Sequence, residues 1–225
     1  MKSLIFTIST ISFLSLFGCS LELVDSWKNP DISTYHPTKV LIIGMTSNTN
    51  ARQQFENQLK EKFELRGSEA ITSMVFFDSL VMTNKISTAQ IDDLETRLLG
   101  EGFDTILLTK VIGVDHKIRY KQDYDGFDST YKKFKEDYLM CQDIYYNPDY
   151  YENYKLYHTE TSMYCICPTK ERDLIWKGYI DVTDPKNVEE IINEYVSLVV
   201  LALEEEQLMS PLKPEKLSNS ADIAI

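Results

Sequence analysis

The stretch from Lys39 to Val111 constrains the fold most, because strand-like and helix-like segments alternate along it. The strand-like segments are short, apolar and rich in β-branched residues; they are Lys39–Gly44, Glu69–Phe77 and Phe103–Val111. Between them, apolar residues recur at helical spacing in Ala51–Phe63 and, after a capping box at Ser87–Gln90, in Ile91–Leu98. This order predicts an α/β fold with a parallel βαβαβ core, in two or three layers.

The second half predicts a late β-hairpin, Thr159–Cys167 with Asp173–Val182, and a C-terminal helix opened by Asp184-Pro185. Between about 115 and 158 no clean period is visible, and ten of the 14 tyrosines fall between Asp115 and Glu160. We expect this Tyr-rich insertion to form loops with short strands or helix. A single domain is expected over 39–209, followed by a loose tail over 210–225.

The amino terminus predicts an export leader. Leu4–Gly18 carries no charge and follows Met1-Lys2, which supplies positive charge. The run is shorter than the ~18 apolar residues of a spanning helix. A charged start, a short apolar segment and a small residue at its end predict a signal peptide over 1–18.

Leu16–Cys19, LFGC, resembles the lipobox of bacterial lipoproteins, with Phe17 bulkier than is usual at that position. The resemblance implies cleavage before Cys19, a diacylglyceryl thioether on its sulfur, and an acyl chain such as palmitate on its amino group. Several acyl chains give lasting membrane attachment. Residues 19–38 would then be a lipidated tether. Since Ser20 and not Asp follows, the resemblance favours the outer membrane, facing the periplasm.

The net charge of -12 argues against nucleic acid as a partner, because such a surface repels phosphate backbones. In an oxidising compartment a disulfide is permitted among Cys141, Cys165 and Cys167. Cys165 and Cys167 share a strand face and are poorly oriented for each other, so the plausible disulfide, if one forms, joins Cys141 to one of them and leaves the other as a free thiol. The histidines lack metal-ligand spacing, and no metal or other cofactor is expected.

No stretch of the sequence predicts catalysis. The loop Gly44–Asn50 has one glycine, which favours helix capping over phosphate binding. The acidic turn Asp123–Asp128 has Phe134 where an EF-hand needs Glu, which favours a solvated turn. There is no G-x-S-x-G, and His158 near Cys165 is no more than proximity in sequence. We therefore expect no enzyme.

The tyrosines of the insertion admit two interpretations. They could pack over the sheet and one another, or they could form a surface for a protein or for sugar rings. The candidate partner surface is Tyr145, Tyr146, Tyr150, Tyr151 and Tyr154.

Several motifs occur in one order along the chain: Trp27–Pro30, Lys39–Gly44, Phe55-Glu56, Arg66-Gly67, Gly102–Asp104 and Leu174–Trp176. In that order they resemble a family of uncharacterised bacterial lipoproteins. The expected fold is similar to the TolB amino-terminal domain, to the curli-secretion lipoprotein and to lipoproteins that activate penicillin-binding proteins. The Tyr-rich insertion departs from all of them.

These resemblances imply a membrane-anchored envelope lipoprotein with a non-enzymatic binding or adaptor role toward a protein or a cell-wall polymer such as peptidoglycan. The alternative is a glycan-binding or small-molecule-binding protein at the periplasm or cell surface, or a hydrolase with its site in the insertion.

Overall fold

The computed structural model describes residues 21–77, 87–120, 133–146, 151–166 and 173–212. Its elements are β1 (Leu21–Lys28), β2 (Lys39–Met45), α1 (Thr49–Leu65), β3 (Glu69–Thr72), α2 (Ser73–Phe76), α3 (Thr88–Gly100), β4 (Thr105–Tyr120), α4 (Phe134–Tyr146), β5 (Tyr151–Cys165), β6 (Leu174–Thr183) and α5 (Val188–Glu205).

Six strands form one mixed sheet in the order β1-β6-β5-β4-β2-β3. β2 runs parallel to both of its neighbours, β3 and β4, while β4, β5, β6 and β1 pair antiparallel in succession. The predicted α/β class is therefore confirmed, with the parallel βαβαβ core at one side of the sheet. The late hairpin and the C-terminal helix are also present.

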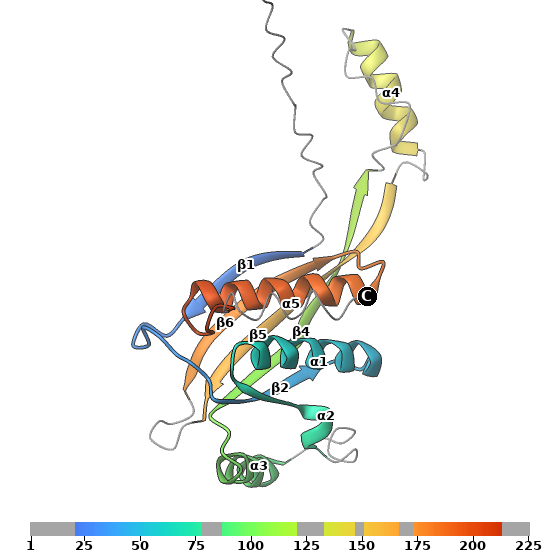
Figure 1. Ribbon diagram of the computed structural model, residues 1–225. Coiled ribbons are helices and arrows are strands. Elements are labelled where there is room, and N and C mark those ends of the chain that lie inside the picture. Colours follow the sequence, from blue (N-terminus) through green and yellow to red (C-terminus); the bar gives the residue numbers. More distant parts are fainter. Residues whose placement is uncertain (1–20, 78–86, 121–132, 147–150, 167–172, 213–225) are drawn as a thin grey trace, which may run out of the picture.

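Alternate residues of β2 face opposite sides of the sheet, and each side is covered. Val40 and Ile42 contact the larger core cluster, to which α1 and α5 contribute Leu59, Phe63 and Val199. Leu41 lies between them in sequence and contacts a second cluster with residues of α2 and α3. Figure 1 shows α1 and α5 running across the sheet and α3 next to its lower edge. Near β2 the fold therefore has three layers.

Local capping follows the sequence at two helices. Asn48 caps α1 by accepting from the Ala51 amide at 3.1 Å, and Ser87 with Gln90 forms the predicted capping box of α3. α1 ends at Leu65, close to Gly67 as predicted, and the φ of Gly67, 96°, lies in the left-handed region that glycine tolerates.

Three local predictions were wrong. Leu21–Lys28, inside the expected tether, forms the edge strand β1, because β6 offers a partner for its backbone. The strand expected over Glu69–Phe77 ends at Thr72 and continues as the short helix α2. α5 is capped by Asn187, whose side chain accepts from the Glu189 amide, and not by Asp184.

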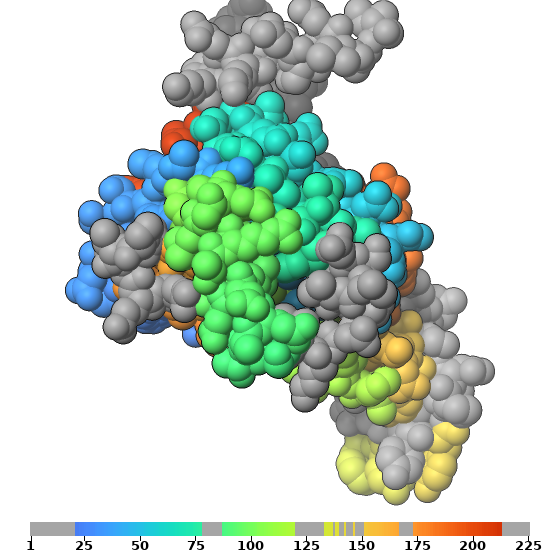
Figure 2. Space-filling model, turned by 90° about the horizontal axis from the view of Figure 1, so that it is seen from below, coloured from blue at the N-terminus to red at the C-terminus, as the bar shows by residue number. Residues whose placement is uncertain are grey.

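The described part of the Tyr-rich insertion is more regular than expected. β4 and β5 stay paired up to Tyr120 and Tyr151, beyond the end of β6 at Thr183. The outer strand segments, His116–Tyr120 with Tyr151–Lys155, and helix α4 are together called the arm. Figure 1 shows the arm leaving the sheet at one end, with α4 farthest from the helices that cover the body. The space-filling view shows its yellow atoms standing clear of the body (Figure 2).

Candidate functional site

The arm exposes large apolar side chains. Phe134 is 81% exposed, Tyr146 73% and Ile118 67%, and Tyr138 and Leu139 are also exposed. The rings of Phe134 and Tyr138 lie 5.7 Å apart on α4. Such exposure on one projecting element is characteristic of a surface that contacts something else.

Ion pairs link the two strands of the arm and tie its base to the body. The Arg119 guanidinium donates to the Glu152 carboxylate and lies 3.6 Å from that of Asp184. It also lies 5.0 Å from the centre of the Tyr154 ring, a cation–π distance. The hydrogen bond to Glu152 raises the pKa of Arg119. The arm is therefore held by local cross-strand contacts.

His158 lies where the arm meets the body. Its Nδ1 is 2.7 Å from the Asp181 carboxylate, and its Nε2 is 3.6 Å from that of Asp115. The hydrogen bond with Asp181, ahead of that with Asp115, raises the pKa of His158. The pKa of Asp115 is lowered, chiefly by its hydrogen bond with Lys117. The negative charges of Asp181 and Asp115 therefore stabilise the protonated His158 ring.

Nearer the centre of the sheet, Glu160 is a buried carboxylate on β5. Its Oε1 lies 3.1 Å from Lys110 Nζ and 3.5 Å from Lys177 Nζ, and it accepts from the Ser162 hydroxyl at 2.8 Å. Burial opposes ionisation of Glu160, but these partners outweigh it together and lower its pKa. The carboxylate is fully compensated.

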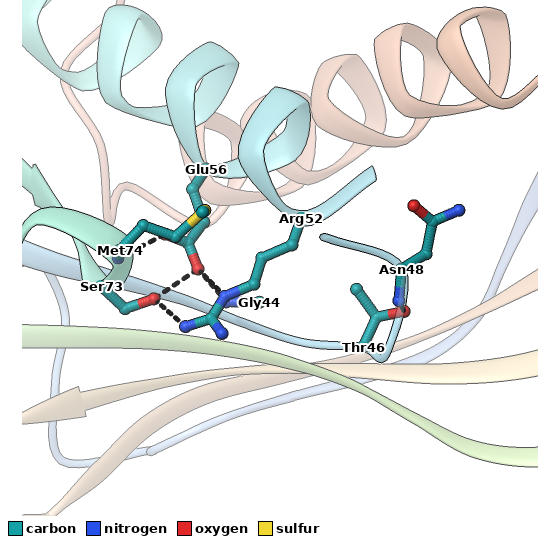
Figure 3. A network of polar contacts seen from close by, with 7 residues as sticks. All are labelled: Gly44, Thr46, Asn48, Arg52, Glu56, Ser73 and Met74. Carbon is teal, nitrogen blue, oxygen red and sulfur yellow. Dashed lines mark hydrogen bonds and ion pairs between the residues drawn. The ribbon is translucent and has the colours of Figure 1, made fainter. Parts of the chain in front are cut away.

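Within the described ranges, the most buried charge belongs to Glu56 on α1, which is 0% exposed. Figure 3 shows its carboxylate between the start of α1, the end of β2 and α2. It accepts from the Gly44 amide at 2.9 Å, from Arg52 Nε at 2.9 Å and from the Met74 amide at 3.2 Å. The Ser73 hydroxyl also donates to it, and Arg52 Nη2 lies 2.5 Å from that hydroxyl.

This network explains two features of the local chain. Ser73 reaches Glu56 and Arg52 because the chain turns into α2 after Thr72, where the sequence predicted a continuing strand. The i,i+4 spacing of Arg52 and Glu56 was a sequence signal for the ion pair, but nothing local indicated that it would be buried.

Beside this network, a groove of about 130 Å³ lies between α1, α5, the end of β2 and the middle of β4. Its lining includes Gly44, Phe55, Thr109 and Tyr195. The Tyr195 hydroxyl is within 2.9 Å of both Thr159 and Thr161, and burial raises its pKa. The loop after β2 caps α1 as predicted, and its first residues form the rim of the groove.

The predicted partner tyrosines are only partly brought together. Tyr146 ends α4, Tyr151 begins β5 opposite Tyr120, and Tyr154 stacks on Arg119. Tyr150 and the side chain of Tyr145 lie outside the described residues. Whether the five form one surface stays a prediction.

Cys165 is disulfide-bonded and 2% exposed. The side chain of Cys141, the whole of Cys167, the lipobox with Cys19, the acidic turn and the tail from 213 lie outside the described residues. The pairing and the lipidation therefore stay predictions. His158 and Cys165 are seven residues apart on β5, roughly 24 Å, too far to act on each other.

Among the described residues, no group of three or more His, Cys, Asp or Glu side chains could hold a metal ion. In the same part of the chain, no helix has the length and apolar character needed to cross a membrane.

No known protein family matches this sequence, and neither does any curated protein. Among solved structures, the PelC dodecamer from Paraburkholderia phytofirmans is 10% identical, with 83% of this chain and 97% of that chain covered and a TM-score of 0.42. Lipoprotein GNA1162 from Neisseria meningitidis is 11% identical, with 75% and 99% covered and a TM-score of 0.40. Likenesses of this size do not bear on what the protein binds or does.

Proposed function

We propose that this chain is a lipid-anchored protein of the bacterial cell envelope that binds a partner through its arm and catalyses no reaction. The observation that carries the proposal is the arm itself, which projects beyond the sheet and exposes Ile118, Phe134 and Tyr146. The membrane anchor is Cys19, and the location is the outer membrane, with the domain facing the periplasm.

A binding role explains why the arm keeps apolar side chains in solvent. Packing over the sheet, the other interpretation of the tyrosines, would bury them, yet Tyr138, Leu139 and Tyr146 of α4 are exposed. Tyrosine suits a surface that alternates between solvent and a partner, because its ring is apolar and its hydroxyl remains hydrated. The arm is therefore the binding element in this proposal.

The charged groups of the body serve structure in this proposal. Glu56 and Glu160 are each surrounded by donors from their own chain. The groove beside Glu56, at about 130 Å³, is smaller than the roughly 300–1,000 Å³ usual for small-molecule sites. Among the described residues, the hollows that a glycan or small-molecule ligand (the alternative expected from the sequence) would find include this groove and a cavity of about 250 Å³ at the base of the arm, lined by His116, Tyr154 and Asp184.

The proposal is tested in cells with a photoreactive p-benzoylphenylalanine replacing Tyr146 in the arm or, as a control, Glu61, an exposed residue of α1. Illumination is expected to produce a crosslinked adduct from position 146 and none from position 61. Adducts from both positions, or from neither, would remove the arm as the binding element.

Anchoring is tested separately by metabolic labelling with palmitate. The natural chain is expected to carry the label and to sediment with membranes, whereas Cys19→Ala is expected to lose both properties. An unlabelled natural chain in the soluble fraction would contradict the anchor, whatever the crosslinking shows.

A further inference from the structure

We infer that the partner of the arm is the lipid bilayer itself, with α4 lying in the headgroup region of the membrane that holds the anchor. The inference rests on the proposed lipid at Cys19. It goes beyond that proposal, because an anchored domain can stand clear of its membrane on a tether.

Strand pairing places the start of β1, two residues after Cys19 in the sequence, at the end of the sheet from which the arm projects. Leu21 on β1 pairs with Val182 on β6, which pairs with Tyr157 on β5, which pairs with Val114 on β4. β1 runs in the same direction as β5, so the chain before Leu21 leaves this row on the side where β5 begins. That side carries the arm (Figure 1).

The length of chain between anchor and sheet is too short to keep the arm away from lipid. Cys19 precedes Leu21 by two residues, which span at most about 7 Å. From Val114 to Tyr120 the arm extends six residues past the same row, about 20 Å. It therefore reaches roughly 13 Å beyond the farthest position of Cys19, whereas the polar layer of one leaflet is about 5–8 Å deep. When the strands stand perpendicular to the membrane, α4 therefore reaches the bilayer.

The side chains of α4 fit that position. Phe134, Tyr138, Leu139 and Tyr146 are exposed to solvent in the isolated chain. Tyrosine is enriched where a membrane meets water, because its ring enters the apolar boundary while its hydroxyl stays hydrated. α4 is not a spanning helix, since its 13 residues extend only about 20 Å. A helix of this kind lies along the interface.

Charge indicates which lipid surface is suited. Lys133–Tyr146 contains two lysines against Glu136, Asp137 and Asp143. In the strands of the arm, Arg119 is paired with Glu152. Lys117 and Lys155 add two further cations, so these segments carry five lysine and arginine residues against four carboxylates. An excess of one charge attracts anionic lipid only weakly, so apolar contact must supply most of the attraction. The lipid surface that suits the arm is therefore zwitterionic, such as one of phosphatidylethanolamine.

The experiment uses the full lipidated chain reconstituted into phosphatidylethanolamine vesicles that contain phosphatidylcholine brominated on its acyl chains, a contact quencher of tryptophan. Trp27, which is exposed, is changed to Phe; Trp176 is buried and stays as a constant background. One variant carries Phe134→Trp and the matched control carries Val75→Trp, since Val75 on α2 is 79% exposed, like Phe134, but lies away from the arm.

The new tryptophan at position 134 is expected to lose a large part of its fluorescence, because the apolar face of an interfacial helix is buried about 5–10 Å into the headgroup and acyl boundary, while that at position 75 is unchanged. Adding phosphatidylglycerol is expected to leave this result unchanged. If the protein floats with the vesicles and neither tryptophan is quenched, the anchor stands and the inference fails. A protein crosslinked from position 146 together with an unquenched position 134 would give the arm a protein partner instead. Quenching at both positions would also overturn the inference. A chain that does not float with the vesicles would contradict the proposed anchor as well.

Discussion

β4 and β5 run through both the body and the arm. Comparing the two parts separates the contribution of backbone pairing from the contribution of side-chain packing. In the body, Leu107 and its partner Met163 are fully buried between sheet and helices. In the arm, Ile118 and its partner Asn153 belong to the same ladder but are both exposed. Backbone pairing continues without a core, so the body supplies the stability and the arm is free to present side chains.

The ion pairs of the body and of the arm also differ in how far they are exposed to solvent. Arg52 and Glu56 in the body share one compact network of donors and acceptors. Arg119 and Glu152 in the arm are ion-paired at a position where both side chains are about 40% exposed. Water screens the second pair and not the first, so loss of a partner should be costly only in the body.

Glu56→Ala is expected to produce the largest effect. It removes the acceptor of the Gly44 amide and leaves the Arg52 guanidinium, whose side chain is only 12% exposed, without its carboxylate. The free energy of unfolding should fall by about 3–5 kcal/mol, as for other broken buried pairs. Urea unfolding followed by circular dichroism measures it. Glu61→Ala, on the exposed face of the same helix, is the control, and equal losses in the two variants would refute the assignment of the network.

Gly178→Ala is expected to have an intermediate effect. A Cβ at this position on β6 would lie 2.4 Å from Cη2 of the buried Trp176 ring, which packs directly over the glycine. The ring or the strand must move, at a cost of about 1–3 kcal/mol. Thermal unfolding measures it, with Trp176 fluorescence as a local probe. Gly113→Ala, where β4 leaves the body, meets only His158 at 3.5 Å and should be tolerated. A stable Gly178→Ala protein would show that the ring does not constrain this position.

Arg119→Ala in the arm is expected to have the smallest effect, with no measurable change in the midpoint of thermal unfolding, because the ion pair is exposed. The matched body variant is Arg66→Ala. Arg66 Nε lies 2.6 Å from the Glu204 carboxylate, with the Arg66 side chain almost fully buried, and its loss should cost about 1–3 kcal/mol. A reversed order of the two variants would contradict the division into body and arm.

The fold was predictable where periodicity is local. The runs that became β2, β6 and α5 have strand and helix patterns that neighbouring residues alone reveal. The capping box at Ser87 and the stop at Gly67 are likewise short-range signals. The strand character of Leu21–Lys28 was missed, because its partner β6 is more than 140 residues away along the chain.

The candidate site was predictable in composition but not in shape. The concentration of tyrosines singled out the insertion as a candidate surface, and two of the named tyrosines, Tyr146 and Tyr154, lie in the arm. The continuous ladder up to Tyr120 and Tyr151 was not visible, since charged and aromatic residues in the arm face water on both sides and leave no alternation.

The sequence by itself determined the α/β class, the order of its core elements and the prediction of a lipid on Cys19, because each depends on residues close together along the chain. Tertiary structure decided that β1 lies next to β6, that the arm and the start of β1 share one end of the sheet, and that Glu56 is buried among four donors. These features depend on which segments, far apart along the chain, become neighbours when the sheet forms. The spacing of residues close together along the chain does not indicate which distant segments pair.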